Sequence, residues 1–322
     1  MIARGGIDLG GTKIQTAVVN GRWEVLGEAR RPTPTSGGPS DVAEQMAEAM
    51  QEAAQAANLE TSALAAVGVG SPGDVNERTG SVSQARNLPS WDGTFELGPW
   101  LGKKLGTTVK VGNDVQVATE AEFHLGAGRP YQSLVGVFWG TGVGGGLILD
   151  GKPWLGRGGA GEIGHIVIKQ DGARCPCGRR GCMEAYAGRA AMEAKARREH
   201  EGGRKTDLFK IMKKHGHDRL TSGIWERALN AEDSLATELI DRAVMALGAG
   251  IASVINLLDV EAVIIGGGLG LRLGQPYVDR IREAMMPHLF ASERPPAVEL
   301  AALGDLGGAI GASLLARNVI RT

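Results

Sequence analysis

IDLGGTKIQTAVVN, at residues 7–20, reads as a β-strand, a tight turn built on two glycines and a second β-strand. The same pattern recurs in LVGVFWGTGVGGGLILDG, at residues 134–151. The first turn is centred on Gly10 and the second on Gly140. A recurrence over so long a separation predicts two similar α/β halves rather than an array of short repeats.

Apolar strands alternate with helices along the rest of the chain. The segment LAAVGVG, at 64–70, has no polar alternation, which predicts a strand buried on both faces of a covered sheet. Helices are expected at 41–58 and 115–125, and a long apolar helix at 235–258 precedes the strand AVIIGGG at 262–268. This alternation predicts an α/β protein.

Composition and charge exclude several classes of protein. The 322 residues are 43% hydrophobic and 4% aromatic, so the core is expected to consist mainly of aliphatic side chains. The formal net charge of −1 does not indicate the excess of positive charge that is typical of proteins that bind nucleic acid or a membrane surface. The N-terminal residues lack the apolar region of a signal peptide, and the longest uncharged apolar run, at 243–258, is shorter than the ~20 residues of a membrane span. We therefore expect a cytoplasmic protein with no membrane or nucleic-acid partner.

The two glycine turns are candidate phosphate sites. GTGVGG, at 140–145, matches the dinucleotide-binding pattern, but a strand follows it where that pattern requires a helix, and no P-loop sequence occurs. A tight hairpin on glycines exposes consecutive backbone N–H groups, which suits phosphate oxygens. One such turn is equally well explained as a plain hairpin, whereas two of them together with GGGLG at 266–270 favour phosphate binding.

Two charged residues flank the first turn. Asp8 stands at a strand end beside it, a position suited to holding Mg²⁺ directly or through water. Lys13 lies at the far side of the turn, where it would meet a phosphate or simply remain a solvated surface lysine.

All three cysteines fall within one stretch, HIVIKQDGARCPCGRRGCME, at residues 165–184. His165, Cys175, Cys177 and Cys182 have the composition and spacing of a zinc site. Four N/S ligands make a closed tetrahedral site, which is structural rather than catalytic. The alternative is three buried reduced thiols beside a hydrogen-bonded histidine.

These motifs together resemble the ROK family of sugar kinases. DLGGTK at 8–13, GTGVGGG at 140–146 and the cysteine patch carry the resemblance, and further motifs extend it over essentially the whole chain. The further motifs are GVGSPGDV at 68–75, NLPSW at 87–91, GND at 112–114, GAGEIGH at 159–165, CPCGRRGCME at 175–184 and VIIGGG at 263–268.

The resemblance implies an actin-like ATPase (ribonuclease H-like) fold, with two α/β domains of mixed sheets and with sugar and nucleotide in the cleft between them. The expected domains are residues 1–114 with 305–322, and residues 115–304, which carry the zinc loop. ROK repressors carry a DNA-binding domain ahead of DLGGTK, whereas this motif starts here at residue 8.

Asp114 is the candidate catalytic base. In the family, the Asp of the Asn–Asp pair accepts the proton of the sugar hydroxyl, and the resemblance assigns Asn113 to hydrogen bonds with the sugar ring hydroxyls. Asp114 also stands where an N-cap would open the helix at 115–125, so capping is its alternative or additional role.

The resemblance marks further ligand contacts. Gly73, Glu162, His165 and Glu184 are the other expected sugar contacts, since a carboxylate can accept from two adjacent hydroxyls; for the two glutamates, ordinary surface charge is the alternative. The residues expected to contact the nucleotide or its Mg²⁺ are Asp8, Gly10, Gly11, Thr12, Lys13, Gly140, Thr141, Gly142, Gly144, Gly266, Gly267 and Gly268.

The implied reaction is transfer of the γ-phosphoryl group of ATP to O6 of glucose, with Mg²⁺ and a structural Zn²⁺ as cofactors. Other hexoses or amino sugars, and polyphosphate as donor, stay open. A sugar-sensing protein without catalysis and an ATPase of the actin or chaperone type are the alternatives from other classes. By resemblance, a homodimer or homotetramer is expected.

Overall fold

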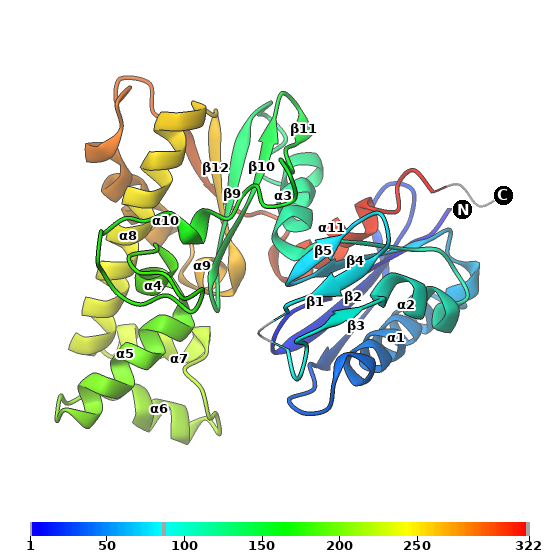
Figure 1. The fold of residues 1–322 in the computed structure, drawn as a ribbon, viewed down its shortest axis with the longest axis horizontal. Helices are drawn as coiled ribbons and strands as arrows, with labels where there is room; N and C mark the ends of the chain where they lie inside the picture. The colour runs from blue at the N-terminus through cyan, green and yellow to red at the C-terminus, as the bar shows by residue number, and fades with distance from the viewer. Residues whose placement is uncertain (1, 86–87, 320–322) are drawn as a thin grey trace. The chain divides into compact units, whose positions relative to one another are not determined.

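The computed structural model describes residues 2–85 and 88–319, and the chain divides into two compact units (Figure 1). Unit 1 is Met1–Arg129 with Ala302–Thr322, and unit 2 is Pro130–Ala301. Asn87 of the NLPSW motif and the outermost residues of the expected first domain, 1 and 320–322, lie outside the described residues.

Unit 1 contains a five-stranded mixed sheet of order β3-β2-β1-β4-β8. The first three strands form an antiparallel meander, and β1, β4 and β8 are parallel neighbours. As predicted from its unbroken apolar sequence, β4 is buried along its whole length. The strands are β1 (Arg4–Leu9), β2 (Lys13–Val19), β3 (Val25–Pro32), β4 (Val67–Ser71) and β8 (Val109–Asn113), with a small separate sheet of β5 (Asp74–Asn76), β6 (Ser81–Ser83) and β7 (Thr94–Phe95).

Helices cover both faces of the unit 1 sheet, and glycines in the strands let them approach closely. A Cβ on Gly5 would lie 2.7 Å from the sulfur of Met50 in helix α1, whereas one on Gly6 would clash with the carbonyl of Ala309 in helix α11. Because successive strand residues face opposite ways, these helices lie on opposite faces. The helices of unit 1 are α1 (Pro39–Ala56), α2 (Leu97–Leu105), α3 (Asp114–Leu125) and α11 (Gly307–Leu314).

Unit 2 repeats the topology of unit 1. Its sheet has the order β11-β10-β9-β12-β13, in which the first three strands in sequence again form an antiparallel meander and the last two are parallel additions. The strands are β9 (Leu134–Trp139), β10 (Val143–Leu149), β11 (Lys152–Pro153), β12 (Ala262–Gly266) and β13 (Ala297–Leu300). The recurring strand–turn–strand pattern of the sequence therefore corresponds to two sheets of the same order.

The core of unit 2 joins buried strand residues to one face of the long helix α8, the yellow helix on the left side of this unit in Figure 1. Asp233 caps α8 by accepting a hydrogen bond from Ala236 N–H at 2.8 Å. Among the described residues, no helix, α8 included, is both long and apolar enough to cross a membrane. The helices are α4 (Glu184–Ala187), α5 (Arg189–Glu201), α6 (Leu208–Lys214), α7 (Ser222–Asn230), α8 (Ser234–Leu258), α9 (Gly267–Leu273) and α10 (Gln275–Met285).

The boundary between the units differs from the one expected after residue 114. Helix α3 packs against α11 and so belongs to unit 1, which continues to Arg129. A Cβ on Gly311 of α11 would lie 2.6 Å from the carbonyl oxygen of Val117 in α3, so the two helix backbones are in close contact. On its return, the chain enters unit 1 at Ala302, three residues before the expected 305.

Gly68→Ala tests the close packing of α11 on the sheet. Gly68 is buried in β4, and a Cβ there would clash with the carbonyl of Ala312 in α11. Because a helix backbone cannot rotate away as a side chain can, we expect a loss of about 1–3 kcal/mol of stability, seen as a lower thermal midpoint. The matched control is Gly93→Ala, which is exposed and has no heavy atom within 4 Å of its Cβ position. Equal midpoints for the two variants would contradict this account of the packing.

Candidate active site

The candidate residues of unit 1 lie at one edge of its sheet. Asp8 in β1 pairs with Gly70 in β4, and a Cβ on Gly70 would lie 3.3 Å from Cα of Asp114. Since β1, β4 and β8 are parallel, the segments that follow them emerge at the same edge. Asp8 and Asp114, which are far apart in the sequence, are therefore close neighbours in the fold.

The first glycine turn is a tight hairpin. Gly10 N–H donates to the carbonyl of Lys13 at 2.9 Å, and the Thr33 hydroxyl donates to the carbonyl of Gly10 at 2.6 Å. Gly11 and Thr12, at the tip, are exposed. The carbonyl groups of Gly10 and Lys13 thus accept hydrogen bonds from within the protein, whereas the tip of the turn remains accessible to a ligand.

Lys13 is paired rather than merely solvated. Its ammonium group lies 2.8 Å from the Asp305 carboxylate and donates to the Gln15 side chain at 2.6 Å. Asp305 also lies 3.8 Å from Arg30. The sequence offered no sign of the Lys13–Asp305 pair, because the two residues come from opposite ends of the chain.

Asp8 is confined between the sheet and helix α11. A Cβ on Gly308 of α11 would lie 2.5 Å from the Asp8 carboxylate, so the helix comes close to this side chain at a glycine. Burial raises the pKa of Asp8 to about 6, against the opposing influence of Lys13, while Asp305 raises it further. A divalent cation at this carboxylate would favour its ionised form. A single carboxylate of this kind fits Mg²⁺, which keeps several waters and phosphate oxygens as ligands.

Asn113, and not Asp114, is the N-cap of α3. The Asn113 side chain accepts from the N–H groups of Val115 and Gln116, both at 3.1 Å. Asp114 is the first residue of the helix, and its carboxylate accepts from Val115 N–H at 3.0 Å. Both side chains are half-buried. The helix end is thus capped without requiring the second carboxylate.

Gly73 lies in the turn between β4 and β5 with a φ of +95°. A Cβ there would be 2.6 Å from the carbonyl of Ser83, so both the backbone conformation and the available space require glycine. The role of Gly73 as a backbone contact to sugar stays a prediction.

The second glycine turn and the glycines after β12 are adjacent in unit 2. Gly140 N–H donates to the carbonyl of Gly142 at 3.0 Å, which closes the hairpin. A Cβ on Gly140 would lie 3.9 Å from Gly268 N. Gly267 has a φ of +80°, and its Cα approaches the backbone of Trp139 closely. Gly144 lies inside β10, opposite Phe138, and is not part of the turn itself.

The histidine and the three cysteines converge as predicted. Their potential ligand atoms lie within 4.8 Å of one another, with Cys177 Sγ 3.7 Å from Cys182 Sγ and Cys175 Sγ 3.8 Å from His165 Nδ1. In a tetrahedral site with Zn–S bonds of about 2.3 Å, two sulfurs are about 3.8 Å apart. The donor set and its spacing therefore fit zinc.

Gly178 and Gly181 let the backbone turn around the sulfurs. Their φ angles are +91° and +81°, in the left-handed region that favours glycine. A Cβ on Gly181 would also clash with the carbonyl of Lys169. Burial raises the pKa of the Cys175 thiol, a cost that a bound cation would offset by stabilising the thiolate.

His165 and Glu162 are brought together. His165 Nε2, on the ring edge opposite the cysteines, lies 3.7 Å from the Glu162 carboxylate. The Glu162 side chain is 64% exposed, whereas that of His165 is 30% exposed. With Nδ1 toward Cys175, the histidine leaves its other nitrogen for a polar partner.

Glu184 links the cysteine patch to the second glycine turn. One carboxylate oxygen accepts from Val143 N–H at 3.0 Å, and the other lies 3.8 Å from Cys175 Sγ. The same carboxylate fills the space that a Cβ on Gly142 would occupy. Glu184 is thus anchored within unit 2 and is not an ordinary surface glutamate.

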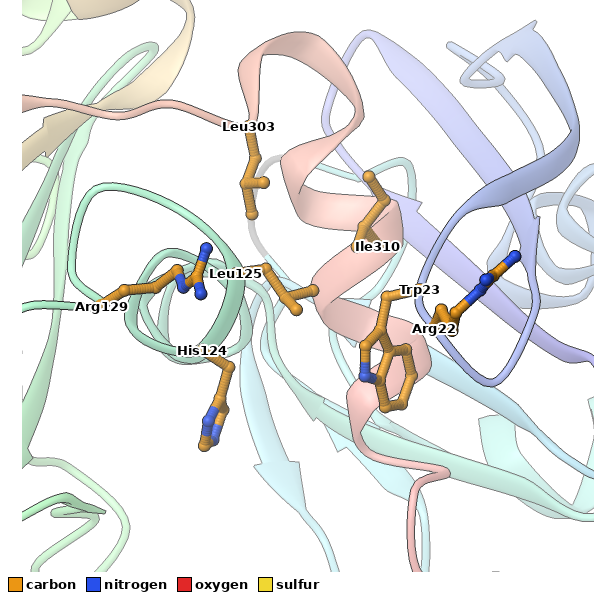
Figure 2. Close-up of a pocket in the computed structure, with 7 residues that line it drawn as sticks. All are labelled: Arg22, Trp23, His124, Leu125, Arg129, Leu303 and Ile310. Carbon is orange, nitrogen blue, oxygen red and sulfur yellow. The ribbon is translucent and has the colours of Figure 1, made fainter.

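Two surface cavities of unit 1 are lined by none of the predicted site residues. Figure 2 shows the first, of about 400 Å³, between the end of α3 and the turn that carries Trp23. The second, of about 640 Å³, includes Gln15 and Asp305, the two partners of Lys13. The lining residues of the first are Arg22, Trp23, His124, Leu125, Arg129, Leu303 and Ile310.

Comparison with known proteins agrees with this arrangement. The sequence model of the ROK family matches residues 4–319. The chain is 32% identical over 295 residues to a glucokinase of Thermotoga maritima, covering 89% of this chain and 88% of that protein. It is 31% identical to an N-acetylmannosamine kinase of Haemophilus influenzae, covering 98% of this chain and 95% of the relative.

A solved structure shares the fold. The ROK glucokinase of Streptomyces griseus, in complex with glucose and AMPPNP, superposes with a TM-score of 0.82 at 30% identity, over 98% of this chain and 99% of that one. The two mixed α/β units are accordingly those of the actin-like ATPase fold. The chain belongs to the ROK family and is a sugar kinase.

Proposed function

We propose that the protein transfers the γ-phosphoryl group of ATP to O6 of glucose. The observation that carries this proposal is the half-buried carboxylate of Asp114, placed on a helix end that Asn113 already caps. A carboxylate at the start of this helix is of the chemical type that serves as a proton acceptor. Similarity to glucokinases of several bacteria favours glucose as the sugar.

In the proposed reaction, the sugar hydroxyl oxygen attacks the γ-phosphorus and the bond to the β-phosphate oxygen breaks, releasing ADP. The hydroxyl proton passes to the Asp114 carboxylate. Phosphoryl transfer depends mainly on positioning and on neutralising charge, and we assign these tasks to Lys13 and to the N–H groups of the two glycine turns. Asp8 would hold Mg²⁺, which neutralises phosphate charge when bound.

Glu162, His165 and Glu184 are the proposed sugar contacts in unit 2. Zinc bound by the Cys₃His cluster would fix the orientation of the His165 ring and of the loop that leads to Glu184. In this proposal zinc has a structural role and takes no part in the chemical step.

The proposal extends to specificity and assembly. Relatives that act on N-acetylmannosamine are almost as similar as the glucokinases, so another hexose or amino sugar is the second candidate substrate. Polyphosphate is the second candidate donor, since the glycine turns suit either. A homodimer or homotetramer in the cytoplasm is the proposed state.

A coupled assay of ADP release over a panel of hexoses and amino sugars tests the function, with polyphosphate compared as donor by following the sugar phosphate. We expect the highest kcat/KM for glucose with ATP. A higher kcat/KM for N-acetylmannosamine would make that sugar the preferred substrate in place of glucose. No turnover with any sugar would contradict the proposed reaction.

Asp114→Asn tests the catalytic base. The amide keeps the shape but cannot accept the proton, so we expect kcat to fall by roughly 10²–10⁴. Loss of a carboxylate from the first helical turn costs at most about 1 kcal/mol, so the thermal midpoint should hardly change. Glu120→Gln is the control, because it makes the same change further along α3, where Glu120 pairs with Arg317 at 3.4 Å. Near-normal turnover by the Asp114 variant would exclude Asp114 as the base.

Cys177→Ala tests the metal and its link to the sugar. We expect metal analysis to show loss of bound zinc, because a site with three ligands binds the ion more weakly. We also expect a higher KM for glucose, since the loop would no longer hold His165 and Glu184 in place. Arg180→Ala, an exposed change in the same loop, serves as the control. Zinc loss with an unchanged sugar KM would show that the loop only stabilises the fold.

A further inference from the structure

Arg189, which none of the sequence motifs indicated, connects three segments of unit 2. It is the first residue of α5, and its guanidinium donates to the Thr141 hydroxyl and to the carbonyl of Leu220, each at 2.8 Å. Ser222, two residues beyond Leu220, places its hydroxyl oxygen 3.8 Å from the position of a Cβ on Gly268. Arg189 thus joins the second glycine turn to the segment that leads into α7, and that segment lies beside the glycines after β12.

The backbone of α5 orients the same turn. Arg189 N–H donates to the carbonyl of Gly140 at 3.1 Å, and Ala190 N–H donates to the carbonyl of Thr141 at 3.0 Å. In a trans peptide the C=O and N–H groups point in opposite directions. The N–H groups of Thr141 and Gly142 therefore point away from α5, as two consecutive donors suited to a phosphate.

In the part of the chain that the structure describes, the guanidinium of Arg189 forms no ion pair with a carboxylate. The two acceptors of its guanidinium, the carbonyl of Leu220 and the hydroxyl of Thr141, are neutral, and Nε is buried without an acceptor among the described residues. Burial lowers the pKa of Arg189, as does the nearby Arg219, against a smaller opposing influence of Glu193. A half-buried cation that lacks an ion pair is costly for a fold, and an anion bound beside it would offset that cost.

Thr141 connects the Arg189 guanidinium to the proposed binding site for the phosphate donor. Its hydroxyl oxygen accepts from Arg189, so its own proton is free to be donated elsewhere. Accepting from a cation strengthens a hydroxyl as a donor. Thr141 is exposed at the tip of the turn, within reach of a ligand.

We propose that Arg189 is a positioning residue for the phosphate donor: it fixes the Gly140–Gly142 turn and the Thr141 hydroxyl so that they bind the anionic phosphates of the nucleotide. This inference rests on the proposed function, because it takes the turn to be the donor site. Two acceptors in different directions require the planar fork of arginine, which a lysine ammonium does not reproduce.

Calorimetry with Mg²⁺ and AMPPNP measures donor binding without catalysis, beside steady-state kinetics for both substrates. For Arg189→Gln, we expect nucleotide binding to weaken about tenfold, as for the loss of a charged hydrogen bond, with the KM for glucose unchanged. Arg189→Lys should fail to restore binding. Arg198→Gln, an exposed arginine of the same helix, is the matched control and should bind nucleotide normally.

A double-mutant cycle with Thr141→Val tests the route of the effect. If Arg189 acts through Thr141, the double variant should have the same affinity for AMPPNP as whichever single variant binds it less tightly. Additive losses would overturn this route, and unchanged nucleotide binding in Arg189→Gln would overturn the proposal. So would an equal rise of both KM values with a lower thermal midpoint, which would indicate a general structural role.

The outcomes separate this inference from the proposed function. Wild-type protein that binds AMPPNP but phosphorylates no sugar would refute the function, while the calorimetric comparison would still decide the role of Arg189. Absence of AMPPNP binding by the wild type would overturn both.

Discussion

Parallel pairing of β1, β4 and β8 is the constraint on which the candidate site of unit 1 depends. Strands that run side by side in the same direction release their following segments at a single edge. Asp8, Gly73 and Asp114 are carried to that edge by three different strands, and the β1–β2 hairpin adds its glycine turn there. In unit 2, the parallel pair β9 and β12 brings two glycine segments together in the same way. Ligands of α/β sheets bind beyond the carboxyl ends of strands for this reason.

Much of this arrangement can be predicted from the sequence, because it is formed by residues that are close together along the chain. A glycine turn between two apolar strands is a short-range pattern, and both hairpins form where it occurs. The ligand atoms of the cysteine patch converge as predicted, because the three cysteines are close in sequence and Gly178 and Gly181 allow the tight turns that bring the sulfurs together. Contacts between segments that are distant in the sequence could not be predicted in this way. The Lys13–Asp305 pair joins distant segments, and the place of α3 in unit 1 depends on its packing against α11. Asn113 and Asp114 suit an N-cap about equally, so only the geometry identifies Asn113 as the cap.

The cysteine patch and the second glycine turn share one side chain. Because Glu184 accepts from Val143 N–H and also lies against Cys175, a shift of the loop would move the backbone just after Gly142. Arg189 holds the other side of the same turn. Two independent anchors on one short hairpin leave it little freedom to rearrange, and a preorganised set of N–H donors is what binding and stabilising a transferring phosphoryl group require.

The packing of α11 on glycines of β1 and β4 has a consequence for how the chain is made. Gly6 and Gly68 face a helix that leaves the ribosome after every element of unit 2, and Arg4 also donates to the carbonyl of Ala316 at 3.1 Å. One face of the unit 1 sheet therefore stays uncovered until the whole of unit 2 has been synthesised. Unit 2 is continuous, from Pro130 to Ala301, and all of its elements emerge before that helix. Since domains fold as units when their residues are available, the second unit is ready to fold before the first can finish, which reverses the usual order from N- to C-terminus.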